Sequence, residues 1–217
     1  MSYIFVHGLG QTSSVWKETN DELNVATNFL CPDLFDLCIG ELNYNNLYRA
    51  FSRYCDKYSD ALDICGLSLG GMLALNYAVD NPDKVHSLVL IGTQYSIPKK
   101  IINLQNFIFK LLPEKYFGKI GMTKEDILSL TRSMINCNFE KDLTKINCPV
   151  LVVCGEKDIA NIKASRKLNE LLNDSRLRII QNAGHEVNKD NPKQLGAELN
   201  AFYLNNFNKF VESGLEN

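Results

Sequence analysis

The sequence is poor in histidine and has no excess of charge of one sign. It contains three histidines and one tryptophan, and its 23 basic and 25 acidic residues give a formal net charge of −2. Because acidic and basic residues are mixed along the chain, no strong field is expected to attract nucleic acid or a membrane surface. We therefore expect a small, roughly neutral molecule as the partner. The oligomeric state stays open.

The sequence also lacks a long apolar run. No uninterrupted apolar stretch approaches the roughly 18 residues that a membrane-spanning helix needs. The first residues, MSYIFVHG, form a strand pattern instead of a basic region, an apolar stretch and a cleavage site. From these absences we expect a soluble, cytoplasmic protein without a secretory signal.

The cysteines lack the spacing of a disulfide framework or a zinc site. They are odd in number and scattered, and no pair is spaced as C-x-x-C. We expect small, buried, apolar thiols in a reducing compartment, and no metal or organic cofactor is implied. The seven positions are Cys31, Cys38, Cys55, Cys65, Cys137, Cys148 and Cys154.

Short apolar runs alternate with helical patterns over almost the whole chain. Four of the six runs are apolar at nearly every residue, which is typical of parallel strands covered on both faces. The alternation predicts an α/β fold, a three-layer α/β/α sandwich around a mostly parallel sheet of about six strands. The expected strands are Tyr3–His7, Phe29–Pro32, Ala61–Gly66, Ser87–Gly92, Pro149–Gly155 and Leu177–Gln181.

The length of 217 residues, 45% of them hydrophobic, suits a single domain. Helices are best marked over Leu69–Val79 and Pro192–Phe210. One segment, Ser96–Asp142, has no strand pattern and contains two helical stretches, Lys99–Leu112 and Thr123–Ile135. We interpret it as a helical insertion within the domain.

A serine lies where a predicted strand passes into a predicted helix. In an open α/β sheet, ligands gather at the carboxyl ends of the strands. The stretch Gly66-Leu67-Ser68-Leu69-Gly70 places this serine on a tight turn, where bulky residues two positions to either side would clash. The N-terminus of the following helix favours a developing oxyanion. Ser68 is therefore a candidate nucleophile.

The glycine-rich stretch His7-Gly8-Leu9-Gly10 directly follows the first strand. An acyl-transfer enzyme holds its oxyanion with the N–H after the nucleophile and a second N–H from a nearby loop. Leu69 and Leu9 are the two candidates, since Gly8 lets the loop approach closely. An ordinary glycine turn is the alternative interpretation.

A carboxylate follows the strand PVLVVC, in Gly155-Glu156-Lys157-Asp158. An acid at this strand end can orient an imidazole and stabilise its charged form. Asp158 is the candidate and Glu156 the local competitor. A helix-capping or surface acid remains the alternative.

The candidate general base is His185, in the stretch AGHE after the last strand. His86 begins a strand at the opposite end of the sheet and is expected to be structural, and His7 is expected to brace the glycine loop. The order Ser68, Asp158, His185 agrees with the nucleophile, acid, base order of this fold class.

Together these motifs resemble the α/β-hydrolase superfamily over nearly the whole chain: HGLG with Trp16 downstream, GLSLGG, PVLVVCGEKD and AGHE, each at a strand end. The resemblance implies a nucleophile, a base, an orienting acid and two oxyanion donors at Ser68, His185, Asp158, Leu9 and Leu69. The insertion 96–142 resembles the cap between the sixth and seventh strands of the family.

Two features depart from the family pattern. The chain as given begins at the HG strand, so the family's first two strands are missing and six are expected instead of eight. The common D-x-P-G-H-G-x-S loop is replaced by Asp33–Gly40, which lines the pocket in many relatives. A particular substrate therefore does not follow from the resemblance.

The leading hypothesis is a serine hydrolase that cleaves small carboxylic esters, with thioesters or lactones as variants. One alternative uses the same triad for C–C bond hydrolysis or for a lyase of the menaquinone-pathway type, with Lys99, Lys100 or Arg132 holding a carboxylated substrate. Another is a ligand-binding protein without turnover.

The apolar first helix of the insertion carries Phe107 and Leu111, which we interpret as lining an acyl pocket. Packing of this helix onto the core is the alternative.

Overall fold

The computed structural model describes residues 2–24, 29–97, 102, 114 and 122–215. Its sheet has six strands, all parallel, in the order β2-β1-β3-β4-β5-β6. The six predicted strands and their parallel pairing are thus confirmed. The strands are β1 (Ser2–Val6), β2 (Phe29–Leu30), β3 (Leu62–Leu67), β4 (Val85–Ile91), β5 (Val150–Gly155) and β6 (Ser175–Ile180).

The strand order reverses once, between β1 and β3. From β1 the chain passes outward to β2, then returns to β3 on the other side of β1 and continues to β6. The connections after β1 and β3 therefore leave the sheet in opposite directions and open a crevice at their carboxyl ends. The motifs HGLG and GLSLGG follow these two strands.

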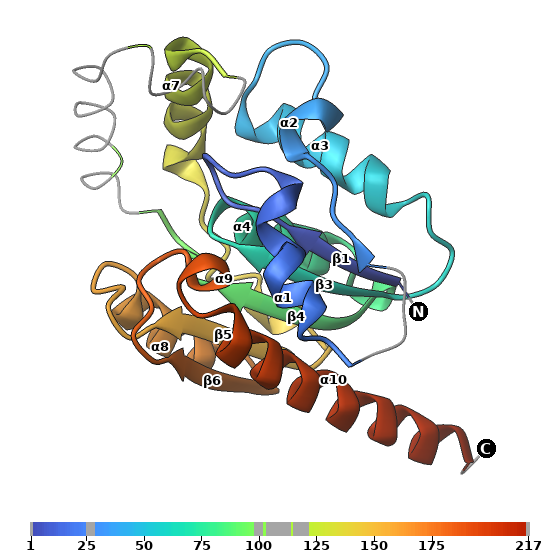
Figure 1. Cartoon of the computed structure of the whole chain (residues 1–217). Helices are drawn as coiled ribbons and strands as arrows, with labels where there is room; N and C mark the ends of the chain where they lie inside the picture. Colours follow the sequence, from blue (N-terminus) through green and yellow to red (C-terminus); the bar gives the residue numbers. More distant parts are fainter. Residues whose placement is uncertain (1, 25–28, 98–101, 103–113, 115–121, 216–217) are drawn as a thin grey trace.

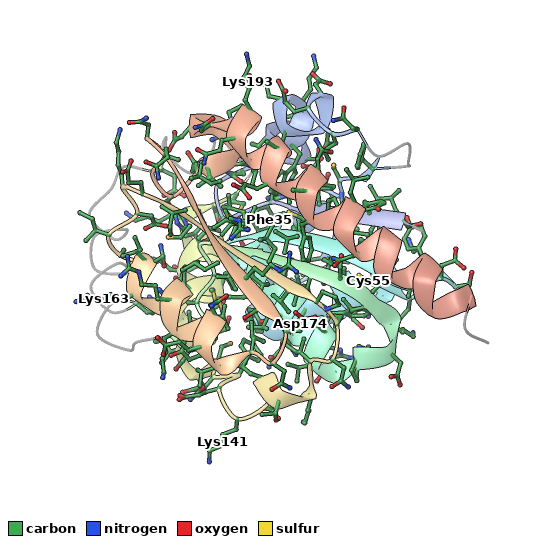
Figure 2. All side chains as sticks on the ribbon, turned by 90° about the horizontal axis from the view of Figure 1, so that it is seen from below. Phe35, Cys55, Lys141, Lys163, Asp174 and Lys193 are labelled. Carbon is green, nitrogen blue, oxygen red and sulfur yellow. The ribbon has the colours of Figure 1, made fainter. Side chains whose placement is uncertain are left out.

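Helices cover both faces of the sheet (Figure 1). One face carries α3 (Tyr44–Cys55), α4 (Leu69–Asp80) and α8 (Ile162–Leu171), and the other carries α10 (Pro192–Leu215). Figure 2 shows α10 lying across the near face of the sheet in the view from below. The shorter helices are α1 (Lys17–Asp21), α2 (Leu34–Leu37), α7 (Lys124–Ser133) and α9 (Val187–Asp190).

Neighbouring residues of one strand pack into different hydrophobic clusters, one on each face of the sheet. The three-layer arrangement therefore follows from the geometry of the strands. Ile64 packs with the α3 and α4 side, while Cys65 packs with the α10 side. Because successive side chains of a strand point to opposite faces, both must be apolar when both faces are covered. All residues of β3 and β5 are buried, whereas the edge strand β6 alternates between partly buried and exposed residues along most of its length.

The helices at Leu69–Val79 and Pro192–Phe210 are confirmed, and both extend slightly further than predicted. The structure also contains α3 and α8, which the sequence analysis does not single out. Among the described residues, no helix combines the length and the apolar character needed to cross a bilayer.

The segment 96–142 leaves and rejoins the body at one place, between β4 and β5. Ser96 and Asn138 form an isolated antiparallel bridge, and the Phe139 N–H donates to the Tyr95 carbonyl at 2.8 Å. This bridge corrects the expectation that the segment has no strand-like pairing. Of the predicted helix Lys99–Leu112, only Ile102 is among the described residues, where it is helical and buried.

The second helical stretch of this segment forms α7, and it begins with a capping box. The Thr123 hydroxyl accepts from the Asp126 N–H, and the Asp126 carboxylate accepts from the Thr123 N–H. The Ser133 hydroxyl at the end of α7 accepts from the Tyr44 N–H at 2.7 Å. The helix is thereby attached to the start of α3.

The seven cysteines are free thiols. Four are buried, and three (Cys31, Cys38 and Cys137) are only partly buried, which corrects the expectation that all are buried. Burial raises the pKa of the Cys154 and Cys137 thiols to about 11. Both thiols are therefore protonated at neutral pH.

A polar cluster lies toward the amino-terminal end of β3 and β4, away from the carboxyl-end motifs. Asp63 is 1% exposed, and its Oδ1 accepts from the Ser87 hydroxyl and pairs with His86 Nδ1 at 2.8 Å. The hydrogen bond to Asp63 raises the pKa of His86 above its ordinary value of 6.5. His86 thus compensates a buried carboxylate, which agrees with the structural role expected for it.

We expect His86→Ala to destabilise the fold by about 3 kcal/mol under mildly acidic conditions, because it leaves the buried Asp63 carboxylate without its cationic partner. A raised folded-state pKa stabilises the protein fully below the unfolded pKa, and this contribution is lost as pH rises through the folded pKa. The destabilisation should therefore be smaller at about pH 8.5 than at about pH 6, measured by urea unfolding. His86→Gln cannot titrate, and an equal pH response in both variants and the wild type would contradict this account.

Candidate active site

Ser68 stands alone at the junction of β3 and α4, since β3 ends at Leu67 and α4 begins at Leu69. Its backbone has φ 54° and ψ −111°, a conformation that non-glycine residues rarely adopt. The Ser68 N–H donates to the Ile91 carbonyl at 2.8 Å, which ties the turn to the end of β4. The turn is therefore strained and anchored.

The glycines on either side of Ser68 are required by backbone contacts. A Cβ atom on Gly66 would lie 2.4 Å from the Gly70 carbonyl oxygen. On Gly70 it would lie 2.3 Å from the Val6 carbonyl oxygen and 2.6 Å from that of His7. The crowding predicted from the sequence thus exists, and it joins the first turn of α4 directly to the end of β1.

The glycine loop after β1 lies against this turn. A Cβ atom on Gly8 would be 3.5 Å from the Ser68 Cβ atom. His7 is fully buried, and its Nδ1–H donates to the Gly8 carbonyl at 2.9 Å while its Nε2 accepts from the Leu34 N–H at 3.0 Å. Burial lowers the pKa of His7, which matches this neutral, one-donor arrangement. His7 braces the loop, as expected from the sequence.

The two proposed oxyanion donors belong to these adjoining segments. Leu69 opens α4, so its N–H is one of the first-turn donors that have no acceptor inside a helix. The Leu9 N–H has no backbone acceptor among the described residues.

Asp158 and His185 are brought together by the loops after β5 and β6. His185 Nδ1 lies 2.7 Å from Asp158 Oδ2, and Asp158 is only 6% exposed. Burial by itself raises the pKa of Asp158, but hydrogen bonds from His185 and Asn161 outweigh it and hold the pKa below its ordinary value. The carboxylate is therefore charged and can orient the imidazole.

Gly92 lets the imidazole approach the end of β4. Its φ is 54°, and a Cβ atom there would lie 3.0 Å from His185 Nδ1 and 3.4 Å from Asp158 Oδ2. The preceding residue, Ile91, accepts the hydrogen bond from the Ser68 backbone. The Ser68 backbone is thus hydrogen-bonded to one residue of this strand end, and the Asp158–His185 pair lies close to the next. No hydrogen bond joins the Ser68 hydroxyl to His185 within the described part of the chain, and such bonds often tighten only when substrate binds.

The competing acid, Glu156, faces a different partner. Its Oε2 accepts from the Asn182 N–H at 2.9 Å. This contact supports Asp158 as the partner of His185.

Asn161 is a site residue that the sequence analysis missed. Its Nδ2 donates to both oxygens of Asp158 at 2.8 Å, and its Oδ1 accepts from Gln94 Nε2 at 2.7 Å. In the sequence, Asn161 shows only the pattern of a helix cap three residues after Asp158. Its contact with Gln94 joins positions 67 residues apart, which no local pattern reveals.

Most of the residues expected to hold substrate are not among the described residues. Phe107 and Leu111 lie outside the described residues, as do Lys99 and Lys100. Arg132 is half exposed and lies 3.6 Å from Glu125. Among the described residues, no group of three or more histidine, cysteine or acidic side chains could hold a metal ion.

Comparisons with known proteins show the family of the chain. A family model described as the alpha/beta hydrolase family matches residues 3–198. The chain is 24% identical to a Bacillus subtilis protein named as a candidate 2-succinyl-6-hydroxy-2,4-cyclohexadiene-1-carboxylate synthase, over 64% of each chain, so it spans less than two thirds of that relative. It is 20% identical to a pimeloyl-(acyl-carrier protein) methyl ester esterase of Aliivibrio fischeri, over 92% of each.

Solved structures share the fold. The structure of MenH from S. aureus superimposes with a TM-score of 0.78 at 17% identity, covering 95% of this chain and 94% of that one.

The strain at Ser68 can be measured from two substitutions. Ser68→Gly should be more stable than Ser68→Ala by about 1 kcal/mol, because glycine adopts this backbone conformation without a Cβ clash. Chemical denaturation of both variants gives the difference in free energy of unfolding. Equal stability, or a more stable alanine variant, would show that the turn stores no strain.

Proposed function

The chain belongs to the alpha/beta hydrolase family, and from this membership we propose that it is a serine hydrolase acting on small carboxylic esters. The observation that carries the proposal is the buried Asp158 carboxylate 2.7 Å from His185. This pair lies at the carboxyl end of the sheet, where the strained Ser68 turn also lies. Ser68 serves as nucleophile, His185 as general base and Asp158 as the orienting acid.

The tautomer of His185 suits this role. Because Nδ1–H donates to the Asp158 carboxylate, Nε2 is free to take the proton from the Ser68 hydroxyl. The Ser68 oxygen then attacks the ester carbonyl carbon, and the Leu9 and Leu69 N–H groups hold the resulting oxyanion. Each such donor contributes about 3 kcal/mol to the transition state.

Collapse of the tetrahedral intermediate completes the first half of the reaction. His185 gives its proton to the departing alcohol, and an acyl group stays on Ser68. Water then enters, loses a proton to His185 and attacks the acyl carbon. When the second tetrahedral intermediate breaks down, the acid leaves and His185 returns the proton to the Ser68 oxygen, which restores both residues. Thioesters and lactones follow the same steps with a different leaving group.

The segment 96–142 is proposed to cover the site as a helical cap. Its two ends pair next to β4, so the intervening chain departs from the strand whose end anchors the Ser68 turn. Phe107 and Leu111 remain the proposed acyl-pocket residues of this cap.

The lyase of the menaquinone-pathway type is the second candidate, because the B. subtilis relative is named as a synthase of a succinyl-substituted cyclohexadiene carboxylate. Such a substrate carries carboxylates, which need cationic partners. Of the three cations proposed to hold such a substrate, Arg132 is among the described residues, and it lies 3.6 Å from Glu125.

The proposal predicts turnover of p-nitrophenyl esters that depends on Ser68. Ser68→Ala and Asp158→Asn should each lower kcat by about 10⁴-fold, since each removes one function of the triad. Rates are measured across acyl chains of increasing length, so that the preferred length reports the size of the pocket. Glu156→Gln is the matched control, because its carboxylate binds a backbone N–H and its activity should stay near that of the wild type.

Two results would count against the ester hydrolase. Turnover that survives in Ser68→Ala would place the reaction elsewhere. A folded wild type without ester turnover would favour the lyase, which a carboxylated substrate of that class would then test.

A further inference from the structure

Gln11 is a buried polar side chain in contact with two separate parts of the site. It is only 3% exposed, and its Oε1 accepts from the Gly8 N–H at 3.1 Å. Its Nε2 donates to Glu186 Oε1 at 2.7 Å and lies 3.4 Å from Asn188 Oδ1. One amide therefore links the loop after β1 to the loop that carries His185.

Gly8, whose N–H the Gln11 side chain binds, also begins the peptide that presents the Leu9 N–H. The Gly8 carbonyl accepts from the His7 imidazole at 2.9 Å and from the Gln11 N–H at 3.2 Å. In a trans peptide the next N–H points opposite to this carbonyl. Because the Gln11 backbone N–H and the His7 imidazole hold the Gly8 carbonyl, the Leu9 N–H is held pointing the other way. The Gln11 side chain adds a restraint on the other side of the same residue, at the Gly8 N–H. This peptide adjoins Ser68, where the oxyanion would form.

The other end of the link is a charged acceptor next to the base. Burial raises the pKa of Glu186, but the hydrogen bonds from Lys189 and Gln11 outweigh burial and hold it below its ordinary value. Glu186 is therefore ionised, and hydrogen bonds to ionised acceptors are stronger than neutral ones. Since Glu186 directly follows His185, this bond restrains the backbone that carries the imidazole.

We propose that Gln11 is a positioning residue that holds the oxyanion donor and the general base in one fixed relation. The Gln11 side chain bonds none of the proposed reacting groups, and it acts through the Gly8 N–H, next to the Gly8–Leu9 peptide, and through Glu186. The inference rests on the proposed function, because it assigns a role within the same site.

Exchanging the amide and the carboxylate between positions 11 and 186 tests this link without removing either side chain. Gln11→Glu keeps the acceptor for the Gly8 N–H but sets two carboxylates against each other, so kcat should fall about 30-fold, less than the 10²-fold or more that follows loss of an oxyanion donor. The double variant Gln11→Glu/Glu186→Gln restores an amide-to-carboxylate bond with the donor on the other side. Its kcat should return to within about threefold of the wild type.

Kinetic constants and inhibitor binding distinguish positioning from a general loss of structure. In Gln11→Glu the KM should change less than about threefold, and affinity for a boronic acid analogue of the tetrahedral intermediate should fall in proportion to kcat. Gln181→Glu is the matched control, because Gln181 is exposed and lies outside the site. Urea unfolding of each variant checks that it is folded under assay conditions.

The outcomes separate the two proposals. Ser68-dependent turnover in the wild type with an unchanged kcat in Gln11→Glu, or no recovery in the double variant, would overturn the role of Gln11 while leaving the hydrolase intact. A wild type that neither turns over esters nor reacts at Ser68 with a fluorophosphonate would overturn both.

Discussion

The arrangement of the site depends on the contact between the first turn of α4 and the end of β1. Gly70 has no side chain, so the helix backbone rests directly on the Val6 and His7 carbonyls. Any Cβ atom there would push α4 away from the sheet, and Ser68 and the glycine loop would separate. Because Gly66 closes on Gly70 from the other side, the turn has one conformation available to it. The position of Ser68 is thus set by backbone packing and needs no side chain to hold it.

The sheet topology determines which loops can meet. The reversal between β1 and β3 opens the crevice, and the parallel order puts the ends of β4, β5 and β6 beside it. Gly92 and Gly155 then let the outer loops close inward, since a Cβ atom on Gly155 would lie 2.0 Å from the Gly184 carbonyl oxygen. Glycines therefore act in two places: they permit the tight Ser68 turn, and they let the loops that carry Asp158 and His185 pack closely at the same end of the sheet.

Residues tied to local pattern could be predicted from the sequence, and residues tied to distant contacts could not. Strands such as β3 and β5 are recognisable because both covered faces demand apolar residues. Ser68 and His185 are recognisable because short motifs mark strand ends. Asn161 and Gln11 cannot be recognised in this way, because each joins a near neighbour to a partner 67 or 175 residues away. The partly buried Cys137 was misjudged for a related reason, since a pattern reports that a residue is apolar and not how deeply its neighbours cover it.

The two missed amides divide one task between them. Asn161 joins the Asp158 carboxylate to Gln94 after β4, and Gln11 joins the backbone next to His185 to the loop after β1. An amide suits both positions because it donates to a carboxylate and accepts from another donor at the same time. His185, the proposed base, is consequently restrained from both sides, while the Ser68 hydroxyl has no hydrogen-bond partner among the described residues. A nucleophile must lose its proton and form a new bond, whereas a base must keep its orientation through both halves of the reaction. This difference explains why the proposed base is held by hydrogen bonds and the Ser68 hydroxyl is not.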